Sequence, residues 1–320
     1  MVEITDTCIL CHSSKARVLT TKLRHNKSGK VVRCEECDFV RLSNPPSSSQ
    51  LNEYYQSQYA TEYYHDVKSD LDSLFHSFLP VQSQRIEKIK PYIQSAHKVL
   101  EIGSGTGYFL CSIKPYVGEV QGQELNKAEA NYAFKEHHIA TDTAAIESSG
   151  LPQQYYDHIC LFQVLEHVVD PSLFLLEIKK FLKPGGKVHI EVPNLLDPLV
   201  WFYEIEEYRD FYYQAPHLTY FSPVTLERVC KMAKYEINSI TAFQQTGLLN
   251  NLNWLFLKKP QASRWECLQV SPSDKNLSKE ISEHVKKSFY DMFLKFNQQY
   301  QTFMETHGFG DMIFATISNY

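Results

Sequence analysis

No stretch of this 320-residue sequence is apolar over the length that a membrane-crossing helix needs. The first residues, 1–6, lack the basic start and the apolar middle of a secretory signal peptide. An excess of positive charge is missing too, since the formal net charge is -5, and this gives no general attraction to nucleic acid or anionic membranes. We therefore expect a cytoplasmic protein without a membrane span, for which nucleic acid is a disfavoured partner unless a local basic patch exists.

What the sequence does contain is the composition of a folded protein, with 43% hydrophobic and 22% charged residues. Its length suits one large α/β domain and a small accessory module. We expect the module over residues 1–42, a linker followed by N-terminal helices over 43–97, and the large domain over 98–320. The linker is predicted from the Pro and Ser residues of 43–50.

Four of the eight cysteines are paired near the start of the chain, and the other four are scattered singly. The pairs are Cys8-Ile-Leu-Cys11 and Cys34-Glu-Glu-Cys37, two C-x2-C motifs separated by enough residues for a small hairpin. Two such motifs present four thiolates tetrahedrally, as in an all-cysteine structural zinc site. With no open coordination position, the zinc is expected to hold the module's structure, and His12 is interpreted as a bystander.

From Lys98 onward, short apolar segments alternate with longer amphipathic ones. This alternation predicts a doubly wound, parallel α/β sheet. The expected strands are 99–102, 117–124, a weak one near 139, 156–162, 187–192, 236–243 and a last one within 308–318, and the expected helices include 71–93, 173–182 and 226–233. Residues from about 246 to 305 show helical patterns without a clear strand, which predicts a helical insertion before the last strand.

The first predicted strand of the large domain ends in a glycine-rich turn, Glu101-Ile-Gly103-Ser-Gly105-Thr-Gly107. Glycines at a strand-to-helix turn let the backbone approach a bound cofactor closely. A dinucleotide fingerprint is excluded, because Tyr108 stands where its third glycine would be. The acidic residue ahead of the glycines suits a cofactor with a positively charged amino-acid end.

This turn resembles motif I of the class I S-adenosylmethionine (SAM)-dependent methyltransferases. Further segments resemble the family in order and spacing: Gln123-Glu124 after the second strand, Leu165-Glu166-His167 after the fourth, Leu182–Gly186 before the fifth and Glu191–Asn194 at its end. The resemblance implies a Rossmann-like fold, doubly wound around a mostly parallel seven-stranded sheet. It also implies that SAM is the cofactor.

The resemblance further assigns cofactor-binding roles to seven residues: Glu101, Gly103, Gly105 and Gly107 at the methionine end of SAM, Glu124 at the ribose, Asp142 near the adenine and Gln163 beside the sulfonium. It also places Tyr54, Tyr55 and Tyr59 over the cofactor from the other side.

Methyl transfer from a sulfonium is an in-line displacement that requires alignment and exclusion of water, and a hydroxyl acceptor benefits from a general base. Two histidines are candidates for that base. His217 follows the fifth strand, in a loop that the family folds over SAM, and His167 begins the segment after the fourth strand. For His167 a purely structural hydrogen bond is the alternative. The aromatic residues of 201–220 form either a stacking pocket for the acceptor or the lid of a core.

The order of zinc ribbon, Asn44-Pro-Pro46, tyrosine-rich stretch and motif I resembles a bacterial group of methyltransferases in surface-polysaccharide and sugar-nucleotide pathways. The favoured hypothesis is therefore O-methylation of a small-molecule or glycan acceptor, a sugar or polysaccharide precursor such as a nucleotide sugar. One alternative is an RNA methyltransferase that uses the ribbon as RNA reader, although no Asn/Asp-Pro-Pro-Tyr follows strand four and no Pro-Cys pair is present. Another is a non-catalytic SAM- and zinc-binding interaction protein. The insertion is interpreted as either a homodimer contact or a substrate cap.

Overall fold

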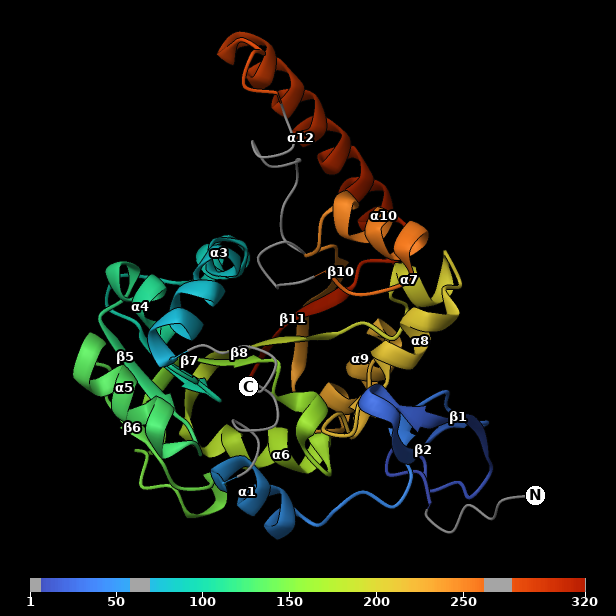
Figure 1. The fold of residues 1–320 in the computed structure, drawn as a ribbon. Coiled ribbons are helices and arrows are strands. Elements are labelled where there is room, and N and C mark those ends of the chain that lie inside the picture. The colour runs from blue at the N-terminus through green and yellow to red at the C-terminus, as the bar shows by residue number, and fades with distance from the viewer. Residues whose placement is uncertain (1–6, 58–69, 262–277, 320) are drawn as a thin grey trace.

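A seven-stranded sheet forms the centre of the molecule in a computed structural model that describes residues 7–57, 70–261 and 278–319 (Figure 1). In spatial order its strands are β10 (Glu236–Phe243), β11 (Met312–Ser318), β8 (Leu182–Pro193), β7 (Tyr156–Phe162), β4 (Lys98–Ile102), β5 (Glu119–Gln123) and β6 (Thr141–Asp142). The five strands from β8 to β6 are parallel, and β11 is antiparallel to both of its neighbours. The predicted Rossmann-like, mostly parallel sheet is thus confirmed.

The chain starts this sheet in its middle, at β4. It moves outward through β5 and β6, then returns to β7 on the other side of β4. The order of the strands therefore reverses between β4 and β7. In open α/β sheets this reversal separates the loops at the carboxyl ends of the two strands, and ligands bind there.

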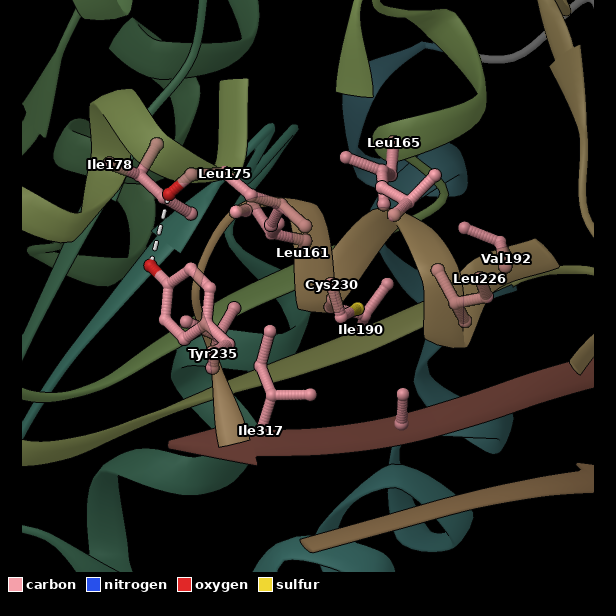
Figure 2. Close-up of a cluster of buried hydrophobic side chains, with 14 of the residues drawn as sticks. Leu161, Leu165, Leu175, Ile178, Ile190, Val192, Leu226, Cys230, Tyr235 and Ile317 are labelled. Carbon is pink, nitrogen blue, oxygen red and sulfur yellow. Dashed lines mark hydrogen bonds between the residues drawn. The ribbon is translucent and has the colours of Figure 1, made fainter. Parts of the chain in front are cut away.

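Helices cover both faces of the sheet because alternate residues of each central strand point to opposite sides. Cys160 and Phe162 of β7 belong to a buried cluster with α3 (Leu71–Ile89), α4 (Tyr108–Ile113) and α5 (Lys127–His137). On the other face, Ile159 and Leu161 pack with α6 (Pro171–Ile178) and α9 (Pro223–Met232). Figure 2 shows this second cluster, with Leu175 and Ile178 of α6 beside the strands.

The N-terminal module is a small antiparallel sheet of β1 (Ala16–Leu23), β2 (Lys27–Cys34) and β3 (Val40–Leu42). Its fourth strand, β9 (Thr219–Tyr220), comes from the large domain and pairs with β3. The module also contacts α8 (Glu206–Tyr212): Lys22 forms an ion pair with Asp210, and Nε of Arg24 donates to the carbonyl of Phe211 (2.6 Å). The module is therefore built into the large domain through a shared sheet.

The helical insertion lies where it is expected, between β10 and β11. Its described helices are α10 (Leu248–Leu257) and α12 (Glu283–Thr306), and α12 extends away from the rest of the molecule (Figure 1). Among the described residues, no helix combines the length and apolarity needed to cross a membrane.

Several segment boundaries differ from expectation, and two of them change where an element begins. Helix α1 (Ser48–Ser57) begins inside the stretch predicted as linker, so only 43–47 connects the module to it. Strand β8 begins at Leu182 and not at Lys187, because Leu182 already pairs with Tyr156 across a β-bulge. The Pro-Gly-Gly sequence thus produces an irregularity within the strand, whereas a break before it was expected.

A row of histidines crosses the sheet at the amino ends of its strands. Nε2 of His158 lies 2.9 Å from Nδ1 of His97, and its Nδ1 lies 3.1 Å from Nε2 of His189. Nδ1 of His189 lies 3.1 Å from the hydroxyl of Thr316. The backbone N–H of Gln94 donates to Nδ1 of His97 (3.2 Å), so that nitrogen is an acceptor. The hydrogen bonds can then run in one direction from Thr316, which requires His158 and His189 to be neutral.

Candidate active site

The glycine-rich turn joins β4 to α4 directly beside the point where the strand order reverses. Gly103, Gly105 and Gly107 all adopt positive φ angles of 72°, 52° and 84°. This left-handed conformation disfavours residues with a Cβ. At Gly103 a Cβ would also lie 2.6 Å from Cγ2 of Val164 in the loop after β7. The sequence pattern of this turn thus encodes a backbone shape that other residues would strain.

Two carboxylates flank the turn. Glu101, at the end of β4, is 1% exposed, and its Oε2 has no hydrogen-bond partner among the described residues. Burial raises its pKa well above the ordinary value, while the positive charge of Arg85 opposes this shift. Glu124, after β5, accepts hydrogen bonds from the backbone N–H groups of Gly105 (2.9 Å) and Asn126 (2.8 Å). The turn therefore lies in an acidic environment that suits a cationic ligand.

Asp142 ends β6 and organises the loop that follows. Its Oδ1 accepts from the backbone N–H of Ala144 (2.9 Å), and its Oδ2 accepts from the hydroxyl of Ser149 (2.7 Å) and the N–H of Gly150 (3.1 Å). These contacts give Asp142 a structural task in the loop where the adenine contact is expected.

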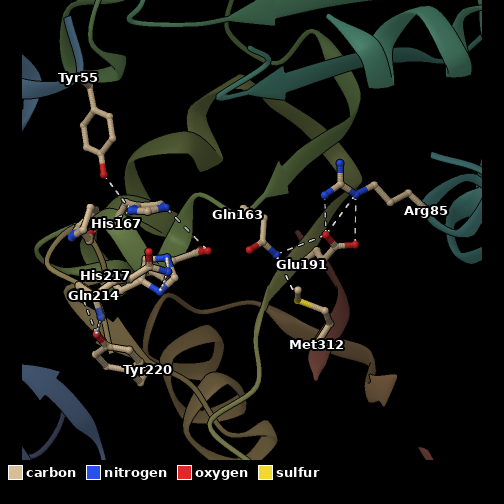
Figure 3. A network of polar contacts seen from close by, with 11 residues as sticks. Tyr55, Arg85, Gln163, His167, Glu191, Gln214, His217, Tyr220 and Met312 are labelled. Atoms are coloured by element: carbon tan, nitrogen blue, oxygen red, sulfur yellow. Dashed lines mark hydrogen bonds and ion pairs between the residues drawn. The ribbon is translucent and has the colours of Figure 1, made fainter. Parts of the chain in front are cut away.

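Gln163, directly after β7, has a positive φ of 60°. Non-glycine residues adopt this conformation rarely, and such strain concentrates at functional sites. Its backbone N–H donates to the carbonyl of Glu191 (2.8 Å), and its side-chain amide lies 3.4 Å from Oε1 of Glu191 and 3.5 Å from Sδ of Met312. Figure 3 shows Gln163 between two groups of polar side chains, with Glu191 on one side and the histidines on the other.

A buried ion pair that the sequence analysis missed joins α3 to this site. Nη2 of Arg85 lies 2.5 Å from Oε1 of Glu191, and Nε lies 3.2 Å from both carboxylate oxygens. Both side chains are at most 2% exposed. The available signal was an arginine on the apolar face of a helix, one residue before Ile86 and four before Ile89. Arg85 thereby compensates one carboxylate in a region rich in buried acids.

The two candidate base residues lie together with Glu166. The rings of His167 and His217 meet edge to face with centroids 4.8 Å apart, and Nε2 of His167 lies 3.9 Å from Oε1 of Glu166. Glu166 is 1% exposed, and neither of its carboxylate oxygens has a hydrogen-bond partner among the described residues. Burial raises the pKa of Glu166 to about 8. The three residues form what we call the Glu166 cluster.

Polar contacts orient the two rings of the Glu166 cluster (Figure 3). Nδ1 of His167 lies 2.9 Å from the carbonyl oxygen of Pro216 and 2.8 Å from the hydroxyl of Tyr55 in α1. Because a carbonyl only accepts, Nδ1 carries the proton and Nε2 has the lone pair. The amide nitrogen of Gln214 donates to Nε2 of His217 (2.9 Å). Burial lowers the pKa of His167 to about 4 and that of His217 well below its ordinary value, so both rings are neutral.

The N-terminal module supports the same cluster through the backbone. The N–H of Leu218 donates to the carbonyl of Glu166 (2.8 Å), and the N–H of Leu42 in β3 donates to the carbonyl of Leu218 (2.8 Å). The segment that carries His217 is thus held between Glu166 and the module. The tyrosine-rich stretch contributes Tyr55, whereas Tyr59 lies outside the described residues.

Most of the aromatic side chains of 201–220 serve as core. Tyr212, Tyr213 and Tyr220 are buried in a cluster with the module's Val31 and Val40. This favours the interpretation of the aromatic segment as a core lid.

The four paired cysteines converge at one end of the module. Sγ of Cys8 lies 3.5 Å from that of Cys37, and Sγ of Cys11 lies 3.4 Å from that of Cys34. All four sulfur atoms lie within 4.8 Å of one another. Ligands of a tetrahedral zinc ion at Zn–S distances of 2.3 Å are about 3.8 Å apart. The donor set and spacing fit such an ion.

Comparison with known proteins places these features in a family context. Residues 63–240, more than half of the chain, match the family described as a methyltransferase domain. An uncharacterized methyltransferase of Schizosaccharomyces pombe is 30% identical over 129 residues, which are 36% of this chain and 46% of that protein. A ubiquinone biosynthesis O-methyltransferase of Proteus mirabilis is 32% identical over 113 residues, 33% of this chain and 45% of that protein.

The chain spans about half the length of the curated relatives that it matches. Among solved structures, a SAM-dependent methyltransferase from Archaeoglobus fulgidus is 19% identical, with a TM-score of 0.46 over 82% of this chain and 100% of that one.

Proposed function

The chain belongs to the methyltransferase-domain family, and on that premise we propose that it transfers a methyl group from SAM to a hydroxyl group of a small molecule or glycan. The observation that carries the proposal is the pairing of the left-handed glycine turn with the buried Glu101 beside the strand reversal. Both features suit a cofactor that brings a cationic amino-acid end close to the backbone.

The residues around the turn fit SAM in their chemistry. Oε2 of Glu101 has no partner among the described residues, and a buried carboxylate of this kind gains from a cationic ligand. We assign Glu101 and the three glycines to the methionine end, Glu124 to the ribose and Asp142 to the loop beside the adenine. Gln163, with its strained backbone, is assigned to the wall next to the sulfonium.

When bound, SAM supplies an electrophilic methyl group on a positively charged sulfur. The acceptor oxygen forms a bond to the methyl carbon as the carbon–sulfur bond breaks, the bonding electron pair stays on sulfur, and the hydroxyl proton must leave. The protein's part is to align the acceptor and exclude water. The Glu166 cluster is where we place the acceptor, because it follows β7 just beyond Gln163. The proton leaves toward His167 or His217, the two candidate bases.

For the acceptor we favour an oxygen of a sugar or polysaccharide precursor, a nucleotide sugar among them. The relative from Proteus mirabilis is an O-methyltransferase, which supports an oxygen acceptor. The RNA alternative is weakened because basic residues of the module already have partners. Lys15 pairs with Glu36 (3.0 Å), and Lys22 and Arg24 bind the large domain.

We further propose that Cys8, Cys11, Cys34 and Cys37 bind one structural zinc ion. The spacing of their sulfur atoms supports this assignment. A module of this size buries too little apolar surface to fold alone, so zinc supplies much of its folding free energy. Through β3 and β9, the same ion would hold the segment of His217 in place.

A turnover assay with three classes of acceptor tests the proposal against its alternatives. The full zinc-loaded chain is incubated with SAM and a nucleotide sugar, a simple phenol or sugar, or a structured RNA, and formation of S-adenosylhomocysteine (SAH) is followed. The proposal expects SAH only with a small hydroxyl acceptor, and a fall in kcat for His217→Gln but not for the exposed His76→Gln control.

The alternatives give different outcomes. Turnover that requires RNA would replace the small-molecule proposal with the RNA alternative. A chain that binds SAH but turns over with none of the acceptor classes would favour the non-catalytic alternative.

A further inference from the structure

The Glu166 cluster presents a set of ligand atoms suited to a metal ion. One such atom from each of Glu166, His167 and His217 lies within 4.8 Å of the others. Two imidazoles and one carboxylate are donors for a first-row divalent metal. An ion at 2.0–2.2 Å from each ligand would hold the three atoms about 3–3.5 Å apart. Side-chain movements of about one ångström close the remaining distance.

The environment of Glu166 is an independent indication that the cluster binds a cation. Its carboxylate is buried, and both oxygens lack hydrogen-bond partners among the described residues. Nε2 of His167, at 3.9 Å, is beyond hydrogen-bond distance. Arg85 does not pair with Glu166, because it forms an ion pair with Glu191 through two of its nitrogens. A buried carboxylate is stable when it is paired or coordinates a metal, and a metal ion held by this cluster would pair with Glu166.

The surroundings of His167 match those of a metal ligand. Ligating histidines usually donate their second ring N–H to a carbonyl or carboxylate, which fixes the tautomer. Nδ1 of His167 has the carbonyl of Pro216 at 2.9 Å, and Nε2 is directed toward Glu166. The ring of His217 is oriented by Gln214, an uncharged amide that can present either its nitrogen or its oxygen.

The histidine row at the other end of the strands provides a contrast. His158 and His189 are buried as well, and each has a partner at both ring nitrogens. No carboxylate takes part in that row, and it is not among the metal-compatible groups of the described residues. Burial of histidines therefore does not by itself produce the arrangement seen at the Glu166 cluster.

We propose that Glu166, His167 and His217 bind one divalent transition-metal ion, such as Zn²⁺, Mn²⁺ or Co²⁺, and that an acceptor oxygen takes one of its remaining positions. The inference rests on the proposed function, because it deepens the assignment of this cluster to the acceptor. Nitrogen donors favour these ions over Mg²⁺ and Ca²⁺, which prefer oxygen ligands. Three protein ligands leave positions open, as catalytic metal sites require.

The ion would change how the acceptor is activated. A bound divalent ion lowers the pKa of an oxygen that it holds. The hydroxyl proton then leaves to solvent, and the oxygen attacks the methyl carbon as the carbon–sulfur bond breaks. His167 and His217 serve as ligands in this scheme, in place of a base. The acceptor class is thereby narrowed to molecules whose hydroxyl can reach a metal ion.

Cobalt titration of the full, zinc-loaded chain tests the site directly. Loading is limited to one equivalent of zinc, which the four thiolates bind most tightly, so that added Co²⁺ reports on the second site. We expect one further equivalent of Co²⁺, with weak visible bands and no sulfur-to-cobalt charge-transfer band. Glu166→Gln and His217→Gln should each weaken Co²⁺ binding at least about tenfold, since loss of supporting groups alone costs 10–100-fold. His76→Gln, which alters an exposed histidine beside Asp72, should leave binding unchanged.

SAH binding, measured on the same samples, separates the two proposals. A chain that binds SAH but takes up no Co²⁺ beyond the zinc site overturns the metal site and leaves the proposed function intact. A chain that binds Co²⁺ but not SAH keeps the metal site and overturns the proposed function. A variant counts only if it retains SAH affinity, and two variants are used so that one misfolded protein does not decide the result.

Discussion

The two sides of the proposed site are built in different ways. On the β4 side, Glu101 and the three glycines are consecutive in the sequence, and the backbone itself makes the shape. On the β7 side, Tyr55, Glu166 and His217 come from three separate segments and are held by side-chain and backbone contacts from α1 and the N-terminal module. A side made from one segment depends on local conformation, whereas a side made from several depends on the whole fold.

Removal of the proposed zinc ion should separate the two sides most strongly. Cys34→Ser breaks the four-cysteine site, and with it the pairing of β3 with β9 beside His217. We expect turnover to fall at least about 100-fold, since small displacements of catalytic groups have effects of that size. SAH affinity, which depends on the β4 side, should stay within about threefold.

Cys111→Ser, a cysteine in α4 outside the proposed zinc site, is the matched control. If Cys34→Ser lowered SAH affinity as much as it lowers turnover, the two sides would not be independent.

A large loss of stability is expected for the ion pair that lies between the sides. Arg85→Met leaves Glu191 buried without its cation, and breaking a buried pair in this way costs about 3–5 kcal/mol. Urea unfolding measures the change. The double variant Arg85→Met/Glu191→Gln should recover part of the loss, and a double variant as unstable as the sum of both singles would contradict the pairing.

Lowering the pH should destabilise the protein through the histidine row at the opposite end of the same strands. Burial, with the nearby His97 as a smaller contribution, lowers the pKa of His158 to about 4 from an ordinary 6.5. Because its folded pKa is depressed, the stabilising neutral form is fully present above about pH 6.5 and is lost as the pH falls toward 4. The loss amounts to about 3 kcal/mol at most.

Unfolding free energies at pH 7 and pH 4.5 should therefore differ less in His158→Gln than in the unaltered chain. If the difference in unfolding free energy between the two pH values were the same in His158→Gln, His158 would not be a cause of the acid destabilisation.

A smaller effect tests the backbone of the β4 side. Gly103→Ala places a Cβ 2.6 Å from Val164 at a φ of 72°, and we expect a destabilisation of about 1–3 kcal/mol together with weaker SAH binding. Gly150→Ala is the control, because its Cβ would meet nothing within 4 Å. Equal behaviour of the two variants in thermal unfolding would contradict the proposed role of the left-handed turn.

The same contrast explains what the sequence could predict. The glycine turn, the strands around it and the two cysteine pairs are local patterns, so their positions could be derived from spacing. Arg85 was missed because its partner Glu191 is 106 positions away. The pairing of β3 with β9 was missed because two short strands give no period to recognise.

The contribution of Glu166 was also beyond sequence reasoning. Its neighbour His167 was singled out, but burial without partners is a property of the fold. Leu182 joined strand β8 for a related reason, since its pairing with Tyr156 outweighs the turn preference of the Pro-Gly-Gly that follows.

The central claim is that the β4 side binds SAM, and calorimetric titration of the full chain with SAH tests it most directly. The account predicts saturable binding at one site, weakened about 10- to 100-fold in Glu101→Gln, because a charged partner contributes about 1.5–3 kcal/mol. Glu119→Gln, a partly exposed carboxylate at the start of β5, should bind SAH as the unaltered chain does. Absence of SAH binding by the unaltered chain would contradict the account at its base.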